Sequence, residues 1–290
     1  MPQKAIKLAG DRTKLIEVLN KKLESAVGKS QKKLLALIVS EFVDQLDVVN
    51  GKIQNTTRNQ RLVSMLDNTF SSYIQTHSPA VLKAIVDGVT GVINFNQKYF
   101  SVFDKPAKLL PINKQVKKAV SAWLGIEDGK IQKNGYLDKL IQVDSVKQLV
   151  KDFAIGKVVN GSGYSETKSA LQSLIDGDES GALGGLQKYY RNFTYDLFSK
   201  VDRTAAKITA DQLDLKYAIY EGGLIKTSRK FCRDRNGKVF TSEEIVEFDP
   251  PEAKPPDYEP ATDLGGYGCR HHLNYIPYAV AVAMRPDLKK

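Results

Sequence analysis

Apolar residues recur every three or four positions through the first 100 residues of this 290-residue chain, which is the period of the buried face of an α-helix. The first two helices are predicted from Leu15, Val18, Leu19, Leu23 and Val27, and from Leu34, Leu35, Ile38, Phe42, Leu46 and Val49. Asp11 or Thr13 could cap the first helix, and Gly51 could end the second. A third helix is expected from about residue 53 to 76, and a fourth from Ser78-Pro79. Residues 1–110 are therefore predicted to form a helical region.

The middle of the chain, residues 111–185, is predicted to hold short helices and loops. Pro106 and Pro111 remove two backbone donors from residues 104–112, which indicates a connector. Shorter helices are expected near residues 113–124, 136–154 and 165–176, with turn-rich segments between them. The composition of residues 176–185 predicts another loop.

The remaining residues, 186–290, change character along their length. The longest predicted helix runs from Leu186 to about Glu221, with Gly222-Gly223 as its C-cap and one apolar stripe formed by Tyr189, Phe193, Leu197 and Val201. Short β-prone segments follow at 238–240 and 273–276, and Asn236-Gly237 could close a two-residue hairpin. Between them, the proline-rich segment 250–260 should be extended and exposed. The predicted fold is mainly α, with a long helix leading into a small α+β C-terminal module that contains a hairpin and a proline-rich loop.

The net charge of +10 lies entirely in the first half of the chain. Residues 1–150 carry 23 lysines and arginines against 13 aspartates and glutamates, and residues 151–290 carry 20 of each kind. Such a basic half could attract nucleic acid or an acidic protein surface, or its lysines could simply keep helix faces solvated. No apolar run is long enough to span a bilayer, so no membrane partner is expected. The opening MPQKAIKLAGDR has no apolar segment, so no secretory signal is expected either.

Motifs for nucleotide binding and hydrolysis are missing from the sequence. The segment Gly28-Lys29-Ser30 has Leu23 where a P-loop needs its first glycine. The sequence also lacks the HExxH, GxSxG and paired CxxC motifs. His77, at the end of a predicted helix, is interpreted as a surface or capping residue. No catalytic residues and no cofactor are therefore assigned from motifs.

Both cysteines and two of the three histidines fall within one 41-residue span, at Cys232, Cys269, His271 and His272. Zinc needs four ligands in a tetrahedron, and these residues supply a candidate metal site. If only one histidine binds, the fourth ligand could be Asp234, the other histidine or a water. The alternative is that two buried thiols pack as small hydrophobic groups, with the histidines hydrogen-bonded nearby. Two cysteines in 290 residues do not make a disulfide scaffold.

Six basic residues are concentrated in the thirteen residues 226–238, KTSRKFCRDRNGK. Arg229, Lys230, Arg233 and Arg235 could contact phosphate or the carboxylates of a neighbouring protein. They could equally form a solvated loop or pair internally, because Asp234 lies among them and two glutamates follow at 243 and 244.

TSRKFCRDRNGKVF at 227–240 and GGYGCRHHLNYIP at 265–277 resemble the end of the Mu F-like head morphogenesis proteins, the minor head proteins of tailed bacteriophages. The resemblance covers roughly residues 186–280. The matching positions are Arg203 and Thr204 on the long helix, Thr227, Ser228, Arg229 and Cys232, then Asn236, Gly237, Lys238 and Phe240, and finally Cys269, Arg270 and His271. Many members of the family have cysteines where this chain has Arg235 and His271, which favours a structural knot over a zinc site.

The resemblance implies a structural protein of the virion, made in the bacterial cytoplasm and present in the phage head in multiple copies. Its expected partners are the portal protein, the major capsid protein and packaged double-stranded DNA. Its expected roles are head assembly and DNA packaging or delivery near the portal or the inner capsid surface. Two other functions stay open at this point: a zinc-dependent nuclease or phage-borne toxin domain, and a DNA-binding regulator.

Overall fold

The structure is a computed structural model that describes residues 2–178 and 183–289, without the side chains of residues 2–6 and 192–195. The helices are α1 (Pro2–Glu41), α2 (Thr57–Phe100), α3 (Pro106–Leu124), α4 (Tyr136–Gln142), α5 (Asp144–Val159), α6 (Tyr164–Asp176), α7 (Gly185–Gln212), α8 (Lys230–Arg235), α9 (Ser242–Val246), α10 (Pro260–Asp263) and α11 (Tyr278–Met284), with 3-10 turns at Val43–Gln45 and Pro286–Leu288. The strands are β1 (Val48–Val49), β2 (Lys52–Ile53), β3 (Ile126–Glu127), β4 (Lys130–Ile131), β5 (Tyr217–Gly222), β6 (Val239–Thr241) and β7 (His271–Ile276). None of the described helices combines the length and the apolar character that crossing a membrane requires.

The chain forms two compact units, each assembled from separated segments. The sheet unit contains residues 1–20, 86–129 and 193–290, and the helical unit contains residues 21–85 and 130–192. Helices α1, α2 and α7 contribute residues to both units. The regions 1–110, 111–185 and 186–290 expected from the sequence describe order along the chain, whereas the compact units gather residues from distant parts of it.

The helical unit is held together by apolar faces that meet in a continuous core. Its buried side chains include Leu23, Val27, Leu34, Ile38, Leu66, Phe70, Tyr73, Ile85, Leu137, Val150, Leu171, Ile175 and Tyr190. Two polar contacts are buried with them. The hydroxyls of Ser30 and Tyr73 are 2.8 Å apart, and the side-chain oxygen of Gln31 accepts a hydrogen bond from the backbone N–H of Gln187 at 3.0 Å. The second contact satisfies a free backbone donor in the first turn of α7.

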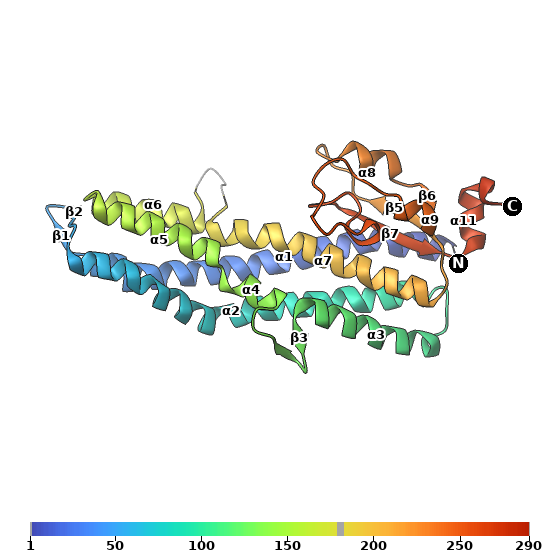
Figure 1. Ribbon diagram of the computed structural model, residues 1–290, viewed down its shortest axis with the longest axis horizontal. Coiled ribbons are helices and arrows are strands. Elements are labelled where there is room, and N and C mark those ends of the chain that lie inside the picture. Colours follow the sequence, from blue (N-terminus) through green and yellow to red (C-terminus); the bar gives the residue numbers. More distant parts are fainter. Residues whose placement is uncertain (1, 179–182, 290) are drawn as a thin grey trace. The chain divides into compact units, whose positions relative to one another are not determined.

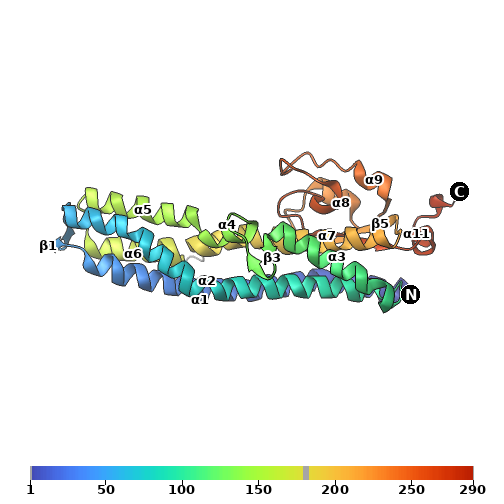
Figure 2. The ribbon, with the colours of Figure 1, turned by 60° about the horizontal axis from the view of Figure 1, so that its bottom comes forward.

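A short hairpin of β1 and β2 marks one end of the helical unit, where α5 and α6 lie beside the adjoining parts of α1 and α2 (Figure 1; Figure 2). The backbone N–H of Ile53 donates to the carbonyl of Ser162, and that of Tyr164 donates to the carbonyl of Gly51. The hydroxyl of Tyr164 also donates to the Asp44 carboxylate at 3.0 Å. These contacts tie the hairpin to the turn between α5 and α6.

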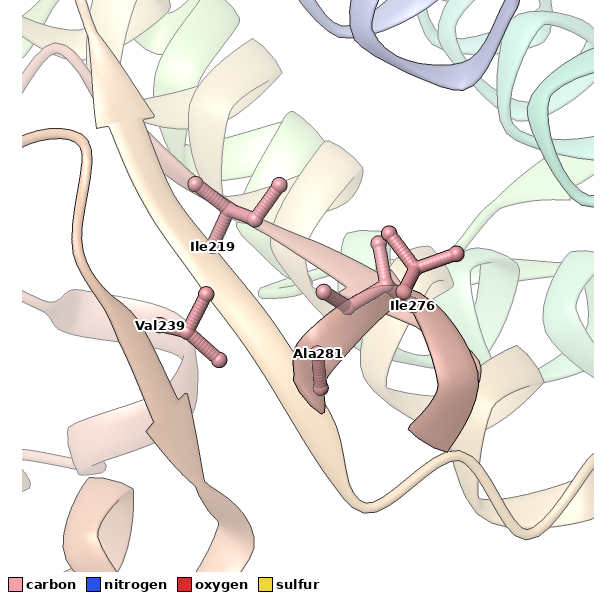
Figure 3. Close-up of a cluster of buried hydrophobic side chains, with 5 residues drawn as sticks. Ile219, Val239, Ile276 and Ala281 are labelled. Atoms are coloured by element: carbon pink, nitrogen blue, oxygen red, sulfur yellow. The ribbon is translucent and has the colours of Figure 1, made fainter. Parts of the chain in front are cut away.

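The sheet unit is built on three antiparallel strands in the order β6-β5-β7. Tyr217 lies opposite Thr241 on β6 and Ile276 on β7, which fixes the register of both pairs. Figure 3 shows the apolar cluster that joins this sheet to α11. Its buried members are Ile219, Val239, Ile276, Val280 and Ala281.

The predicted fold class, mainly α with a small α+β C-terminal module, is confirmed. Several predicted boundaries in the first half are wrong. The two helices expected over residues 15–27 and 34–49 are one helix that is continuous from Pro2 to Glu41. A 3-10 turn and the β1–β2 hairpin follow it, and Asn50 and Gly51, with φ of 51° and 74°, turn the hairpin. Helix α2 continues through Ser78-Pro79, and α3 begins at Pro106 within the expected connector. Proline in the first turn of α3 loses no helical hydrogen bond.

The helix expected over residues 186–221 is also shorter than predicted. It ends at Gln212, and the residues that follow it form β5, so Gly222 ends a strand and is no helix cap. Asn236-Gly237 does not close a two-residue hairpin, because helix α8 precedes it and β6 pairs with β5. In the proline-rich segment Pro250 and Pro255 are buried, although most of their neighbours are exposed. Residues 179–182 of the expected loop and the side chain of Phe193 lie outside the described parts.

Candidate functional site

Two adjacent histidines at the start of β7 face opposite sides of the sheet, as neighbours on a strand must. His271 lies opposite Gly222 on β5, and His272 lies opposite Glu221. The ring of His271 faces the two cysteines, whereas His272 faces α7, where its Nδ1 is 2.8 Å from the carboxylate of Asp202. The candidate ligand set from the sequence is therefore divided, and His272 lies outside the cysteine group.

Cys232, Cys269 and His271 converge in one buried group. Their sulfur and ring nitrogen atoms all lie within 4.8 Å of one another. The two sulfurs are 3.9 Å apart, and the sulfur of Cys269 is 3.8 Å from Nδ1 of His271. Cys232 comes from α8, while Cys269 and His271 come from the segment that leads into β7, so the group joins α8 to the sheet.

The hydroxyl of Tyr220, on β5, reaches the same group. It donates to the sulfur of Cys232 at 3.3 Å and is 3.8 Å from that of Cys269. The Tyr220 ring stacks on His271 with ring centroids 5.0 Å apart, and Phe231, Phe240 and Phe248 surround it edge-on. Tyr220 was not among the predicted site residues, because residues 217–221 were expected to be the end of a helix. A strand there would have placed alternate residues on the face toward the cysteines.

The two thiols differ in acidity because they share one hydrogen bond. The contact with Cys232, assisted by the Arg203 guanidinium, lowers the pKa of Cys269 despite its burial. The same contact and burial raise the pKa of Cys232. Burial and the nearby sulfurs raise the pKa of Tyr220, so its hydroxyl stays protonated and can donate. The group thus combines one acidic thiol, that of Cys269, with the Cys232 thiol that donates to it, while the Tyr220 hydroxyl donates to the Cys232 sulfur.

Two arginines fix the backbone around the group. Arg203, on α7, donates to the carbonyls of Cys269 at 2.6 Å, His271 at 2.9 Å and Thr262 at 3.1 Å. Arg229 donates to the carbonyls of Gly265 at 3.0 Å and Tyr267 at 2.7 Å. Charge-assisted bonds of this kind are among the strongest in a protein, and here they hold a segment without regular structure against α7 and α8.

The other residues of the family motif are used for local structure. The side-chain oxygen of Asn236 accepts from the N–H of Gly222 at 3.0 Å, and Gly237, with φ of 81°, donates to the carbonyl of Tyr220. The hydroxyl of Ser228 accepts from the N–H of Ile225, near the start of the loop at Thr227. Of the other motif residues, Thr204 lies on α7, Thr227 lies in the loop before α8, and Lys238 and Arg270 come directly before β6 and β7.

The basic segment 226–238 is paired within the protein. Lys230 forms an ion pair with Asp234, which is exposed and lies outside the cysteine group. Arg233 donates to the carbonyl of Ser228, and Arg235 lies over the ring of Phe231, with 3.7 Å from its guanidinium carbon to the ring centroid. Asp234 is therefore no ligand of the site, and internal pairing is the arrangement found for this segment.

A second buried polar cluster, not anticipated from the sequence, lies on the other face of β7. Arg12 donates to the side-chain oxygens of Asn274 at 3.0 Å and Asn96 at 3.2 Å, and its Nε is 3.4 Å from the Asp202 carboxylate. Asn96 and His272 both contact the same carboxylate at 2.8 Å. Burial lowers the pKa of His272, so its neutral ring can donate to Asp202. A lone Arg in an amphipathic helix gives no signal of this role.

Comparisons of the chain with known protein families, with characterised proteins and with solved structures found no match.

Proposed function

We propose that this chain is a structural minor head protein of a tailed bacteriophage. It is made in the bacterial cytoplasm and built into the virion in multiple copies, at the portal or the inner capsid surface, where it acts in head assembly and in DNA packaging or delivery. Its partners are the portal protein, the major capsid protein and, for the basic half of the chain, packaged double-stranded DNA. The proposal starts from the sequence resemblance over residues 186–280.

The observation that carries the proposal is that the motif residues of the sheet unit bind the backbone or pack in the interior. Arg203 and Arg229 direct their guanidinium groups at backbone carbonyls, and Asn236 binds a backbone N–H. Cys232 and Cys269 face each other in the interior. These side chains close a module on the end of α7, as expected for a motif that maintains a structure.

The geometry gives less support to a zinc-dependent nuclease or toxin domain. Such an enzyme needs a metal with a position open to substrate and a general base within reach. Cys232 and Cys269 are only 3% and 2% exposed, and His271 is 2% exposed. A substrate phosphate could not reach this group without displacing the surrounding aromatic side chains, so a structural role is favoured.

The proposal is tested in the phage whose genome carries this sequence. Heads purified on a density gradient should contain the chain in a fixed ratio to the portal protein, measured by quantitative mass spectrometry. Deletion of the gene should lower the yield of filled heads, and the wild-type gene supplied from a plasmid should restore it.

Two arginines on α7 provide a matched pair for the complementation. Arg203→Ala removes three bonds to the backbone, whereas Arg191 is exposed on the same helix. We expect Arg191→Ala to restore filled heads and Arg203→Ala to fail. Absence of the chain from purified heads would overturn the proposal.

A further inference from the structure

The cysteine group has the spacing of a metal-bound tetrahedron. Zinc lies about 2.3 Å from thiolate sulfur and about 2.0–2.1 Å from imidazole nitrogen, so a tetrahedron has sulfur–sulfur edges of about 3.8 Å and sulfur–nitrogen edges of about 3.6 Å. The two sulfurs are 3.9 Å apart, and the sulfur of Cys269 is 3.8 Å from Nδ1 of His271. The third pair, Cys232 and His271, lies within 4.8 Å.

A fourth donor stands at the corresponding distance. Oxygen ligands bind zinc at about 2.0–2.2 Å, which gives oxygen–sulfur edges of about 3.6 Å. The hydroxyl of Tyr220 is 3.3 Å from one sulfur and 3.8 Å from the other. Tyr220 is completely buried, so its hydroxyl lies beside the two sulfurs in the protein interior.

The backbone around the two sulfurs packs closely against them and is held in place by arginines. A Cβ on Gly265 would lie 2.5 Å from the sulfur of Cys232 and 3.2 Å from that of Cys269, so only glycine leaves the sulfurs their positions. Arg229 holds the carbonyl of Gly265, and Arg203 holds the carbonyls of Cys269 and His271. The donors are thus fixed through their backbone, which reduces the entropy lost on binding an ion.

Packing of neutral thiols against a hydrogen-bonded histidine accounts for the group less well. Among the described residues, Nε2 of His271 is buried and has no hydrogen-bond partner, and Nδ1 has only the 3.8 Å contact with sulfur. A buried imidazole without a normal hydrogen bond is costly. A metal bound at one ring nitrogen removes part of that cost.

We propose that Cys232, Cys269, His271 and the hydroxyl of Tyr220 bind one structural zinc ion. The two thiolates neutralise the dication, the imidazole binds as a neutral ligand, and the Tyr220 phenol, made acidic by the ion, gives up its proton and binds as phenolate. Two thiol protons and the phenol proton are released on binding, so affinity falls as the pH is lowered. The ion joins α8, β5 and β7, and this role does not depend on where the protein acts.

The first test measures metal in the purified full chain, with any affinity tag removed. Elemental analysis should give about one zinc per chain. Cys269→Ser and His271→Ala should each lower zinc retention after dialysis by about tenfold or more. His77→Gln is the control, because His77 belongs to the helical unit, and it should retain the ion.

The second test is decided on the wild-type chain, so its outcome does not depend on whether a variant folds. Cobalt added to the zinc-free wild-type chain should produce thiolate-to-cobalt absorption in the near ultraviolet and intense visible bands of a tetrahedral ion. Tyr220→Phe should keep the thiolate absorption and shift the visible bands, because it removes one oxygen ligand. A wild-type chain that is folded by circular dichroism, free of zinc and spectroscopically silent with cobalt would overturn the proposal, as would an intact mass showing a disulfide.

Discussion

At the scale of single residues, the sheet unit depends on one ion pair in its interior. Arg12 and Asp202 are each about 1% exposed, and neither charge could be buried alone without a large cost in desolvation. Asn96, Asn274 and His272 supply hydrogen bonds to the pair. The cluster joins α1, α2, α7 and β7, so it determines which helices can pack on the sheet.

Removing one partner of this pair should be strongly destabilising. Asp202→Asn leaves the Arg12 guanidinium buried without a counter-charge and should lower the free energy of unfolding by about 3–5 kcal/mol. Asp211→Asn, on the same helix, breaks an exposed pair with Lys207 and should cost less than about 0.5 kcal/mol. Urea unfolding followed by circular dichroism measures both. Equal losses in the free energy of unfolding would show that the buried ion pair contributes no more to stability than the exposed one.

The carboxyl group of Asp202 should make the stability of the protein depend on pH in the acidic range. Burial by itself would raise the pKa of Asp202, but the Arg12 guanidinium and the hydrogen bond with His272 outweigh it and lower the pKa to about 2. The unfolded chain takes up this proton near pH 3.9, so the contribution is complete above about pH 4 and is lost as the pH falls to about 2.

The free-energy difference between the wild type and Asp202→Asn should therefore shrink by about 2–3 kcal/mol between pH 5 and pH 2. Equilibrium unfolding at several pH values measures this difference. A difference that stays constant over that range would mean that the pKa of Asp202 is the same in the folded and the unfolded chain.

At the scale of elements, a glycine sets how closely α2 and α7 approach within the sheet unit. A Cβ on Gly88 would lie 2.5 Å from the ring of Phe198, whereas one on Gly91 would meet only the methyl groups of Leu19 at 3.9 Å. The two glycines are one turn apart on the same helix and share its backbone conformation. They differ in the side chains that lie next to them.

Alanine at these two positions should have opposite effects. Gly91→Ala should stabilise the protein by about 0.5–1 kcal/mol, because alanine is the better helix former and the space is open. Gly88→Ala gains the same propensity but must displace an aromatic ring, and it should destabilise by about 1–2 kcal/mol. Thermal unfolding of the two variants checks the signs. Stabilisation by both would contradict the close packing of Phe198.

At the scale of the whole molecule, the excess positive charge of residues 1–150 gives α3 an exposed basic face. Lys114, Lys117 and Lys118 follow one another at helical spacing, and all three are exposed. In the proposed virion role this face contacts the phosphates of packaged DNA.

Binding of the full chain to non-specific duplex DNA should therefore weaken steeply with salt. Replacing the three lysines with alanine should reduce the slope of log K against log salt by roughly 2–3, because each phosphate contact contributes about 0.9. Fluorescence anisotropy at 50–200 mM salt measures the slope. Lys207→Ala, which removes a lysine paired with Asp211, is the control and should leave it unchanged. An unchanged slope in the triple variant would mean that these lysines do not contact DNA, and would favour a protein partner for this face.

Local patterns in the sequence determined the mainly helical fold class, because amphipathic periodicity needs only neighbouring residues. They also located β6 and β7 closely and placed Cys232, Cys269 and His271 in one candidate site. The same patterns placed Val18 on a buried stripe, although it is nearly half exposed. They predicted the end of one helix near residue 76, the start of another at Ser78-Pro79 and a further helix end at Gly51, as if each helix stood alone.

Only the tertiary structure decided the rest. Helix α2 continues through Pro79 because packing along its length outweighs one lost backbone hydrogen bond. His271 and His272 are adjacent in sequence, yet the pleat of β7 sends one to the cysteines and the other to Asp202. The partners of Arg12 are 84 to 262 positions away along the chain. Contacts at such separations depend on how the helices and the sheet pack, and no local pattern of residues encodes them.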